Sequence, residues 1–116
     1  MRRDRLLIDE MIDAAQRIVD LVGDLSADDI AINRERRDAI LWNFTVLGEA
    51  ATSISEQTRA LRPDTDWRDP ARLRNRIVHG YWSVDLDVIV VAARHDVPVL
   101  LQELRIVAAA LAAMDM

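Results

Sequence analysis

The apolar residues of this chain recur at alternating intervals of four and three, and this spacing constrains the fold more than any other feature. Three stretches carry it: Leu7, Met11, Ala14, Ile18, Leu21 and Leu25; Ile40, Phe44, Leu47, Ala51 and Ile54; and Leu100, Leu104, Val107 and Leu111. Such spacing places apolar side chains along one face of an α-helix. Only three glycines and three prolines interrupt the 116 residues. The sequence therefore predicts an all-α, up-and-down bundle of about four main helices plus short helical turns.

Capping residues indicate where the first helices begin and end. Ser26 followed three residues later by Asp29 resembles a capping box, which predicts a short helical turn. Asn33 is a suitable N-cap for the second long helix. Pro63 and the polar residues after it end that segment, because proline lacks the backbone donor that a helix interior needs.

The second half of the chain contains three further signals. Asp69-Pro70 is typical of an N-cap and first helical residue, and Gly80 is a natural C-cap, so a third helix is expected between them. A helix restarts over residues 83–87, Asp96-Val97-Pro98 predicts a break, and a last helix is expected from about 99 to 114. No internal repeat or linker appears, so we expect a single domain over residues 1–116.

Composition excludes several classes of protein. The chain has no cysteine, so neither a disulfide nor a thiolate site is possible. No uninterrupted apolar run approaches the roughly 20 residues of a membrane span, and the first residues do not resemble a secretion signal. We therefore expect a soluble, cytoplasmic protein with no membrane partner. Fifteen arginines, no lysine and twenty acidic residues give a net charge of −5. Binding to nucleic acid would thus require a local basic patch.

Such a patch occurs in the third predicted helix, residues 67–82. At about 100° per residue, one polar stripe of this helix contains Arg68, Arg72, Asn75, Arg76 and His79. Arg74 falls on the other side, between Ile77 and Val78. A charged group on an apolar face is costly unless it is paired or lines a functional cleft. Arg74 is therefore the most anomalous residue of the sequence.

The residues around Arg74 suit chemistry at a phosphodiester. His79 ends the helix, where the helix dipole favours a cation. An imidazole beside arginines can move protons while a guanidinium stabilises charge on phosphorus. Tyr81 adds a hydroxyl nearby. One imidazole surrounded by guanidinium groups is a poor metal site, so we expect neither a metal nor another cofactor.

The segment Arg74-Asn75-Arg76-Ile77-Val78-His79-Gly80-Tyr81 fits the arginine, four residues, histidine, any residue, tyrosine signature of the HEPN superfamily. The chain resembles its HepT-like toxin branch over nearly its whole length. Further segments match that branch in order and spacing, namely Leu47-Gly48-Glu49-Ala50-Ala51, Trp67-Arg68, Val84-Asp85-Leu86-Asp87 and Asp96-Val97-Pro98.

The resemblance implies a toxin that is a metal-independent endoribonuclease and acts as a homodimer on tRNA or mRNA. It assigns catalysis to Arg74 and His79 and a supporting role to Asn75. It also implies a partner, a minimal nucleotidyltransferase antitoxin of the MntA type, which silences the toxin by transferring AMP to Tyr81. Two copies related by a two-fold axis would place two histidines in one cleft. Cleavage needs both a base and an acid, so this arrangement is chemically reasonable.

Other interpretations of these residues stay open. The chain could instead be an inactive HEPN module that binds its nucleotidyltransferase, or a nucleotide-binding domain. Arg68, Arg72 and Arg76 are candidates for RNA-backbone contacts or a solvated face in equal measure. Tyr81 and Trp82 could be core or interface aromatics, whereas His95 and the arginines at 34, 36 and 37 are expected at the surface. Glu49 is either exposed or paired with Arg74, since Gly48 would allow close helix approach.

Overall fold

The computed structural model describes residues 2–115 and shows a bundle of α-helices. The helices are α1 (Arg2–Val22), α2 (Ala27–Ile32), α3 (Arg34–Ser53), α4 (Glu56–Arg59), α5 (Asp69–His79), α6 (Leu86–Val91) and α7 (Val97–Met114), with a 3₁₀ turn η1 (Tyr81–Ser83) and a π-helical turn η2 (Ala92–Asp96). No strand forms within residues 2–115. The predicted all-α architecture is confirmed.

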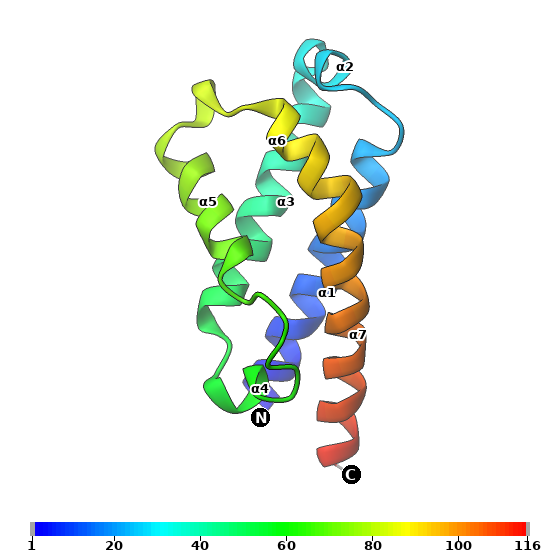
Figure 1. Ribbon diagram of the computed structural model, residues 1–116, viewed down its shortest axis with the longest axis vertical. Helices are drawn as coiled ribbons and strands as arrows, with labels where there is room; N and C mark the ends of the chain where they lie inside the picture. The colour runs from blue at the N-terminus through cyan, green and yellow to red at the C-terminus, as the bar shows by residue number, and fades with distance from the viewer. Residues whose placement is uncertain (1, 116) are drawn as a thin grey trace.

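The core lies where α1 packs against α3 on one side and α7 on the other (Figure 1). All five residues of the second predicted stripe are buried, from Ile40 to Ile54. The first stripe is only partly correct. Leu7, Leu21 and Leu25 are half-buried, whereas their neighbours Ile8, Ala15 and Val22 are fully buried. The reason is that α1 is enclosed by two helices, which require an apolar face wider than a single stripe.

The helix ends confirm two of the predicted caps and correct a third. Ser26 and Asp29 form the complete capping box of α2, and the Asn33 side chain accepts from the backbone N–H of Arg36 at 3.1 Å. Asp69, however, is the first residue of α5 and not its cap. The N-cap is Arg68, whose side chain makes no capping hydrogen bond, and the carboxylate of Asp66 instead accepts from the backbone N–H groups of residues 68 and 69 at 3.1 and 3.2 Å. The end at Gly80 agrees with the prediction.

The predicted break at Asp96-Val97-Pro98 is wrong. The chain stays helical from Leu86 to Met114 and passes through the wider turn η2, in which the N–H of Val97 bonds to the carbonyl of Ala92. Pro98 is the second residue of α7, and α7 directly follows η2. A π-helical turn thus replaces the break.

This long helix is also apolar. By length and composition alone, residues 86–114 would suffice to cross a membrane, with a mean hydropathy of 1.7 over the most apolar window. Its buried residues Leu101, Leu104, Val107 and Leu111 pack in the same core as α1. Of the most apolar stretch of this helix, 28% is buried.

The second predicted helix ends earlier than expected, at Ser53 and not at Pro63, and the separate short helix α4 that follows it is joined to the start of α1. The carboxylate of Asp4 is buried and accepts hydrogen bonds from the hydroxyls of Ser55, the N-cap of α4, and Thr58. Burial alone would raise the pKa of Asp4, but these hydrogen bonds outweigh it and hold the pKa below its usual value. The contact fixes the end of the bundle opposite α2 (Figure 1).

Candidate functional site

Helix α5 is placed by its packing against α3, and Gly48 sets their distance. A β-carbon at Gly48 would lie 2.3 Å from Cβ of Arg74 and 2.5 Å from the carbonyl oxygen of Pro70. Only glycine permits this approach. At the far end of the pair, Asp38 of α3 meets Tyr81 just beyond α5. The two helices are therefore antiparallel, and α5 lies along the outer side of α3 (Figure 1).

Arg74 is paired at this crossing. Its Nη2 lies 2.7 Å from Oε2 of Glu49, and its Nη1 donates to Oδ1 of Asn75 at 2.7 Å. The side chain of Arg74 is 30% exposed and that of Glu49 62%. The Nε of Arg74 is buried and has no hydrogen-bond partner among the described residues. Of the two alternatives for Glu49, exposure and pairing with Arg74, the structure shows both, because the pair forms while Glu49 stays exposed. The side-chain carbons and Nε of Arg74 are therefore held in place, while its two Nη atoms reach the surface.

The outer face of α5 carries the remaining candidates, and all of them are exposed: Arg68, Arg72, Asn75, Arg76 and His79. Arg72 is already engaged, because its Nη2 lies 3.0 Å from Asp66 and 3.5 Å from Asp69. Helix geometry separates Arg74 and His79 by about 7.5 Å along the axis and about 140° around it. In one chain, these two side chains therefore do not converge on the same point.

Tyr81 is held against α3 by three contacts. Its hydroxyl donates to Oδ1 of Asp38 at 2.5 Å, and its backbone carbonyl accepts from Arg37 at 3.5 Å. The Arg37 guanidinium also lies 5.5 Å from the centre of the Tyr81 ring. The hydrogen bond to Asp38, with some burial, raises the pKa of Tyr81 above its ordinary value. The side chain of Trp82 lies outside the described part of the structure.

Sequence reasoning missed Asp38 and Trp42 and misplaced two arginines. Arg37 stacks on Tyr81, and Arg36 donates to the carbonyl of Leu21 at 2.7 Å, so neither is simply solvated. Trp42 precedes Glu49 by seven residues, which places both on one face of α3, and it is 65% exposed. The register of the two antiparallel helices could have indicated Asp38. Because Gly48 lies opposite Arg74, residues ten positions before Gly48 in α3 must lie near the C-terminal end of α5. His95 is exposed, as expected.

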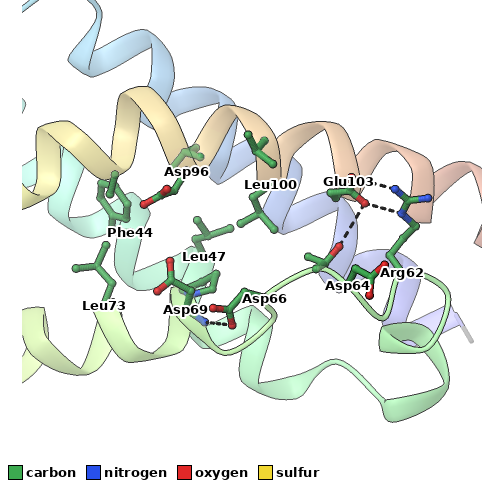
Figure 2. A pocket seen from close by; sticks show the side chains of 15 residues that line it. Phe44, Leu47, Arg62, Asp64, Asp66, Asp69, Leu73, Asp96, Leu100 and Glu103 are labelled. Carbon is green, nitrogen blue, oxygen red and sulfur yellow. Dashed lines mark hydrogen bonds and ion pairs between the residues drawn. The ribbon is translucent and has the colours of Figure 1, made fainter.

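A cavity with a volume of about 530 Å³ lies between α5 and the end of η2 and start of α7. Figure 2 shows its apolar floor, with Phe44, Leu47, Leu73 and Leu100, and several carboxylates around it. Five acidic residues line this cavity, namely Asp64, Asp66, Asp69, Asp96 and Glu103. Its arginine, Arg62, forms a two-point ion pair with Glu103 at 2.5 and 3.0 Å. Such a surface repels phosphate, so the cavity is not an RNA site.

Metal binding finds no obvious place in the residues that the structure covers. Within residues 2–115, no three histidine, aspartate or glutamate side chains gather closely enough to hold an ion. The candidate site consists instead of guanidinium, imidazole and phenol groups. It offers cationic hydrogen-bond donors and one imidazole for proton transfer.

An all-α bundle that presents Arg74, His79 and Tyr81 along one helix and the turn after it defines a HEPN-like domain. A sequence profile of the family described as "Ribonuclease HepT-like" matches residues 11–107. The chain therefore belongs to the HepT-like ribonuclease family, as the resemblance in its sequence predicts.

Two relatives show how far the similarity extends. The "Probable ribonuclease HepT" of Thermococcus cleftensis is 25% identical over 78% of this chain and 83% of its own length. The "Putative RNase MJ1380" of Methanocaldococcus jannaschii is 24% identical over 84% and 90%. No solved structure shows significant similarity to the chain.

Proposed function

We propose that this chain is the toxin of a toxin–antitoxin pair, a metal-independent endoribonuclease that cleaves tRNA or mRNA in the cytoplasm. Arg74 and His79 are its catalytic residues. Asn75 and Glu49 orient Arg74, and Arg68, Arg72 and Arg76 contact the RNA backbone. Family membership and the relatives' names support RNA as the substrate.

The observation that carries the proposal is the ion pair of Arg74 with Glu49 beside the Gly48 crossing. A guanidinium fixed by a carboxylate and by tight helix packing is preorganised to stabilise charge that develops on phosphorus. Arg74 lies within the matched region, one and a half turns before the exposed His79. A merely structural arginine would not need the Gly48 contact and a partly exposed head together.

A second copy of the chain completes the site in this proposal. Arg74 and His79 diverge around α5, so one chain offers either a proton-transfer group or a charge stabiliser at a given point. The α3–α5 register places Trp42 level with Val78 on the Arg74 side, and these residues are 65% and 50% exposed. Exposed apolar side chains beside a charged cleft are typical of a protein interface. A two-fold dimer would bring both histidines and both Arg74 residues together.

Neutralisation is the last part of the proposal. A minimal nucleotidyltransferase of the MntA type transfers AMP to Tyr81. The hydroxyl lies two residues beyond His79, so the added phosphate would bring negative charge and bulk to the place where the RNA phosphate binds. Blocking by charge repulsion then accounts for silencing.

Cleavage is tested with the purified protein, tRNA and mRNA in the presence of EDTA. We expect cleavage that survives the chelator. Loss of activity in EDTA, with recovery on adding Mg²⁺, would contradict metal independence. Absence of cleavage under both conditions would favour an inactive module that only binds its nucleotidyltransferase.

The site is tested with His79→Ala and Arg74→Ala. Each should lower cleavage by about 100-fold or more, since general acid–base groups and charge stabilisers contribute effects of this order. His95→Ala and Arg105→Ala are matched controls, because both residues are exposed and lie away from α5. Circular dichroism and sedimentation establish that each variant is folded and dimeric. Full activity in the folded dimeric variants would refute the assignment.

A further inference from the structure

Asp38 has no part in the proposed cleavage of RNA, yet it faces the hydroxyl of Tyr81. That hydroxyl donates to Oδ1 of Asp38 at 2.5 Å, and Nε of Arg34 lies 3.9 Å from the other carboxylate oxygen. Arg37 covers the ring at 5.5 Å. The hydroxyl of Tyr81 therefore has Asp38 as its acceptor, with one guanidinium over the ring and a second beside the same carboxylate, all from the first two turns of α3.

A phenol that attacks phosphorus must lose its proton. An ordinary tyrosine is ionised in about one molecule per thousand at pH 7. In this protein the hydrogen bond to Asp38 raises the pKa of Tyr81 further, so the phenol keeps its proton at neutral pH. The nucleophile therefore needs a base within hydrogen-bonding distance, and the Asp38 carboxylate occupies that place.

We propose that Asp38 is the general base for adenylyl transfer to Tyr81 and that Arg34 binds the phosphate of the transferred AMP. This inference rests on the proposed neutralisation by a nucleotidyltransferase that uses ATP. The Tyr81 oxygen forms a bond to the α-phosphorus of ATP, and the bond from that phosphorus to the bridging oxygen of the β-phosphate breaks. Pyrophosphate leaves, and the phenol proton moves to Asp38.

Arg37 and Arg34 have different roles in the proposed transfer. Arg37 is half-buried and committed to the ring and to the carbonyl of Tyr81, so it positions the nucleophile. The side chain of Arg34 is 88% exposed and makes only a long contact with Asp38. Its guanidinium is available to a phosphate that arrives at the phenol oxygen, and charge-assisted bonds of this kind are strong.

The first experiment measures transfer of labelled AMP from ATP to the chain by a purified minimal nucleotidyltransferase of the MntA type. Asp38→Asn keeps an oxygen that accepts the Tyr81 hydrogen bond but removes the base. We expect transfer about 100-fold slower at pH 7. Asp13→Asn is the matched control, because Asp13 forms a comparable surface pair with Arg17 on α1. Arg34→Ala should slow transfer roughly tenfold, and Arg17→Ala should not.

The pH dependence separates a base from a structural role. Without its base, transfer requires phenolate formed in advance, so the rate of Asp38→Asn relative to wild type should rise about tenfold per pH unit below the Tyr81 pKa. The charged groups facing the phenol are Asp38, Arg34 and Arg37 of α3. His79 lies nearby along the chain and is present in both proteins, so its effect cancels in the ratio. A ratio that stays constant with pH would overturn the role of Asp38 as base.

A third measurement tests the contact itself. Tyr81 is the only tyrosine in the chain, so ultraviolet titration reports its ionisation directly. Asp38→Asn should lower the Tyr81 pKa, and an unchanged value would refute the hydrogen bond. If wild-type protein cleaves RNA but accepts no AMP, the proposed neutralisation fails and this inference fails with it. If wild type and Asp38→Asn accept AMP equally fast, only the role of Asp38 fails.

Discussion

Gly48 lies so close to Arg74 that a methyl group on its α-carbon would fall 2.3 Å from Cβ of that residue and 2.5 Å from the Pro70 carbonyl oxygen. Neither neighbour is the end of a flexible side chain. Gly48→Ala must therefore move α5 away from α3. We expect a loss of about 2 kcal/mol in the free energy of unfolding, measured in urea, together with a loss of cleavage.

Gly80→Ala is the control for this prediction. A β-carbon at Gly80 would meet the Ser83 hydroxyl at 3.0 Å, and that group can rotate away. The backbone of Gly80 has a negative φ, which other residues also adopt. If Gly48→Ala and Gly80→Ala had the same free energy of unfolding, α3 and α5 would not be in close contact at Gly48.

Glu49→Gln should separate orientation from stability. The carboxylate partner of Arg74 is 62% exposed, and ion pairs that solvent reaches contribute below about 1 kcal/mol, so the free energy of unfolding should hardly change. Cleavage should fall, because the guanidinium loses the carboxylate that orients it. RNA-cleavage kinetics of Glu49→Gln, Arg74→Lys and the double variant would measure the coupling between the two residues. Independent, additive effects would mean that Glu49 does not act through Arg74.

Mixing wild-type chains with His79→Ala chains tests the shared cleft. If both histidines serve one reaction, only dimers of two wild-type chains are active, and activity falls as the square of the wild-type fraction. One part wild type to two parts variant should then leave about one ninth of the activity after exchange, instead of about one third for independent sites. The linear result would place a complete site within each chain.

RNA binding should depend on salt unequally for neighbouring arginines. Arg72 is neutralised by Asp66 and Asp69, whereas Arg76 has no ion pair with another described residue. Arg76→Ala should therefore reduce the slope of log affinity against log salt by about 0.7 for each RNA phosphate that the protein no longer neutralises, and Arg72→Ala by less. Equal changes for both variants would show that RNA displaces the two aspartates from Arg72.

Asp4 predicts a specific loss of stability in acid. Its folded pKa lies below the unfolded value of about 3.9, so its contribution is complete above that pH and is lost as the pH falls through the folded pKa. Asp4→Ala should lose about 1–3 kcal/mol at pH 7, because the Ser55 and Thr58 hydroxyls lose their acceptor. Its difference from wild type should shrink below about pH 4 in denaturant titrations. A difference that stays constant with pH would assign the effect to packing.

Local signals of the sequence predicted local structure well. The capping box at Ser26 and the cap at Asn33 involve residues three positions apart, so the sequence contains all their partners. The contact between Glu49 and Arg74 could also be predicted, because a charge on an apolar face needs a partner and Gly48 permits close approach. Physical reasoning singled out Arg74 and His79 as candidates, and the family resemblance supplied their assignment as catalytic residues, which stays a prediction.

Two kinds of feature were harder to predict: long-range contacts, and a helix-breaking residue whose effect is offset by the structure around it. Asp38 looks like one solvated acid among arginines until the register of α3 against α5 is known. Asp4 likewise bonds to residues more than fifty positions away. Pro98 normally signals a break, but the π-helical turn before it removes the conflict, and no residue in that turn is diagnostic. The first two errors reflect packing between segments distant in the sequence, and the third reflects a local change of helix type.

The helix that carries most of the candidate site residues, α5, lies beside the core that stabilises the bundle. Among the long helices, α5 packs extensively only against α3, whereas the core is shared by α1, α3 and α7. Substitutions in α1 or α7 can therefore change the free energy of unfolding while the surface of α3 that packs against α5 stays the same. Evolution could exchange most core residues and keep α5 in register with α3, provided that Gly48 and Asp38, which contact Arg74 and Tyr81, are retained.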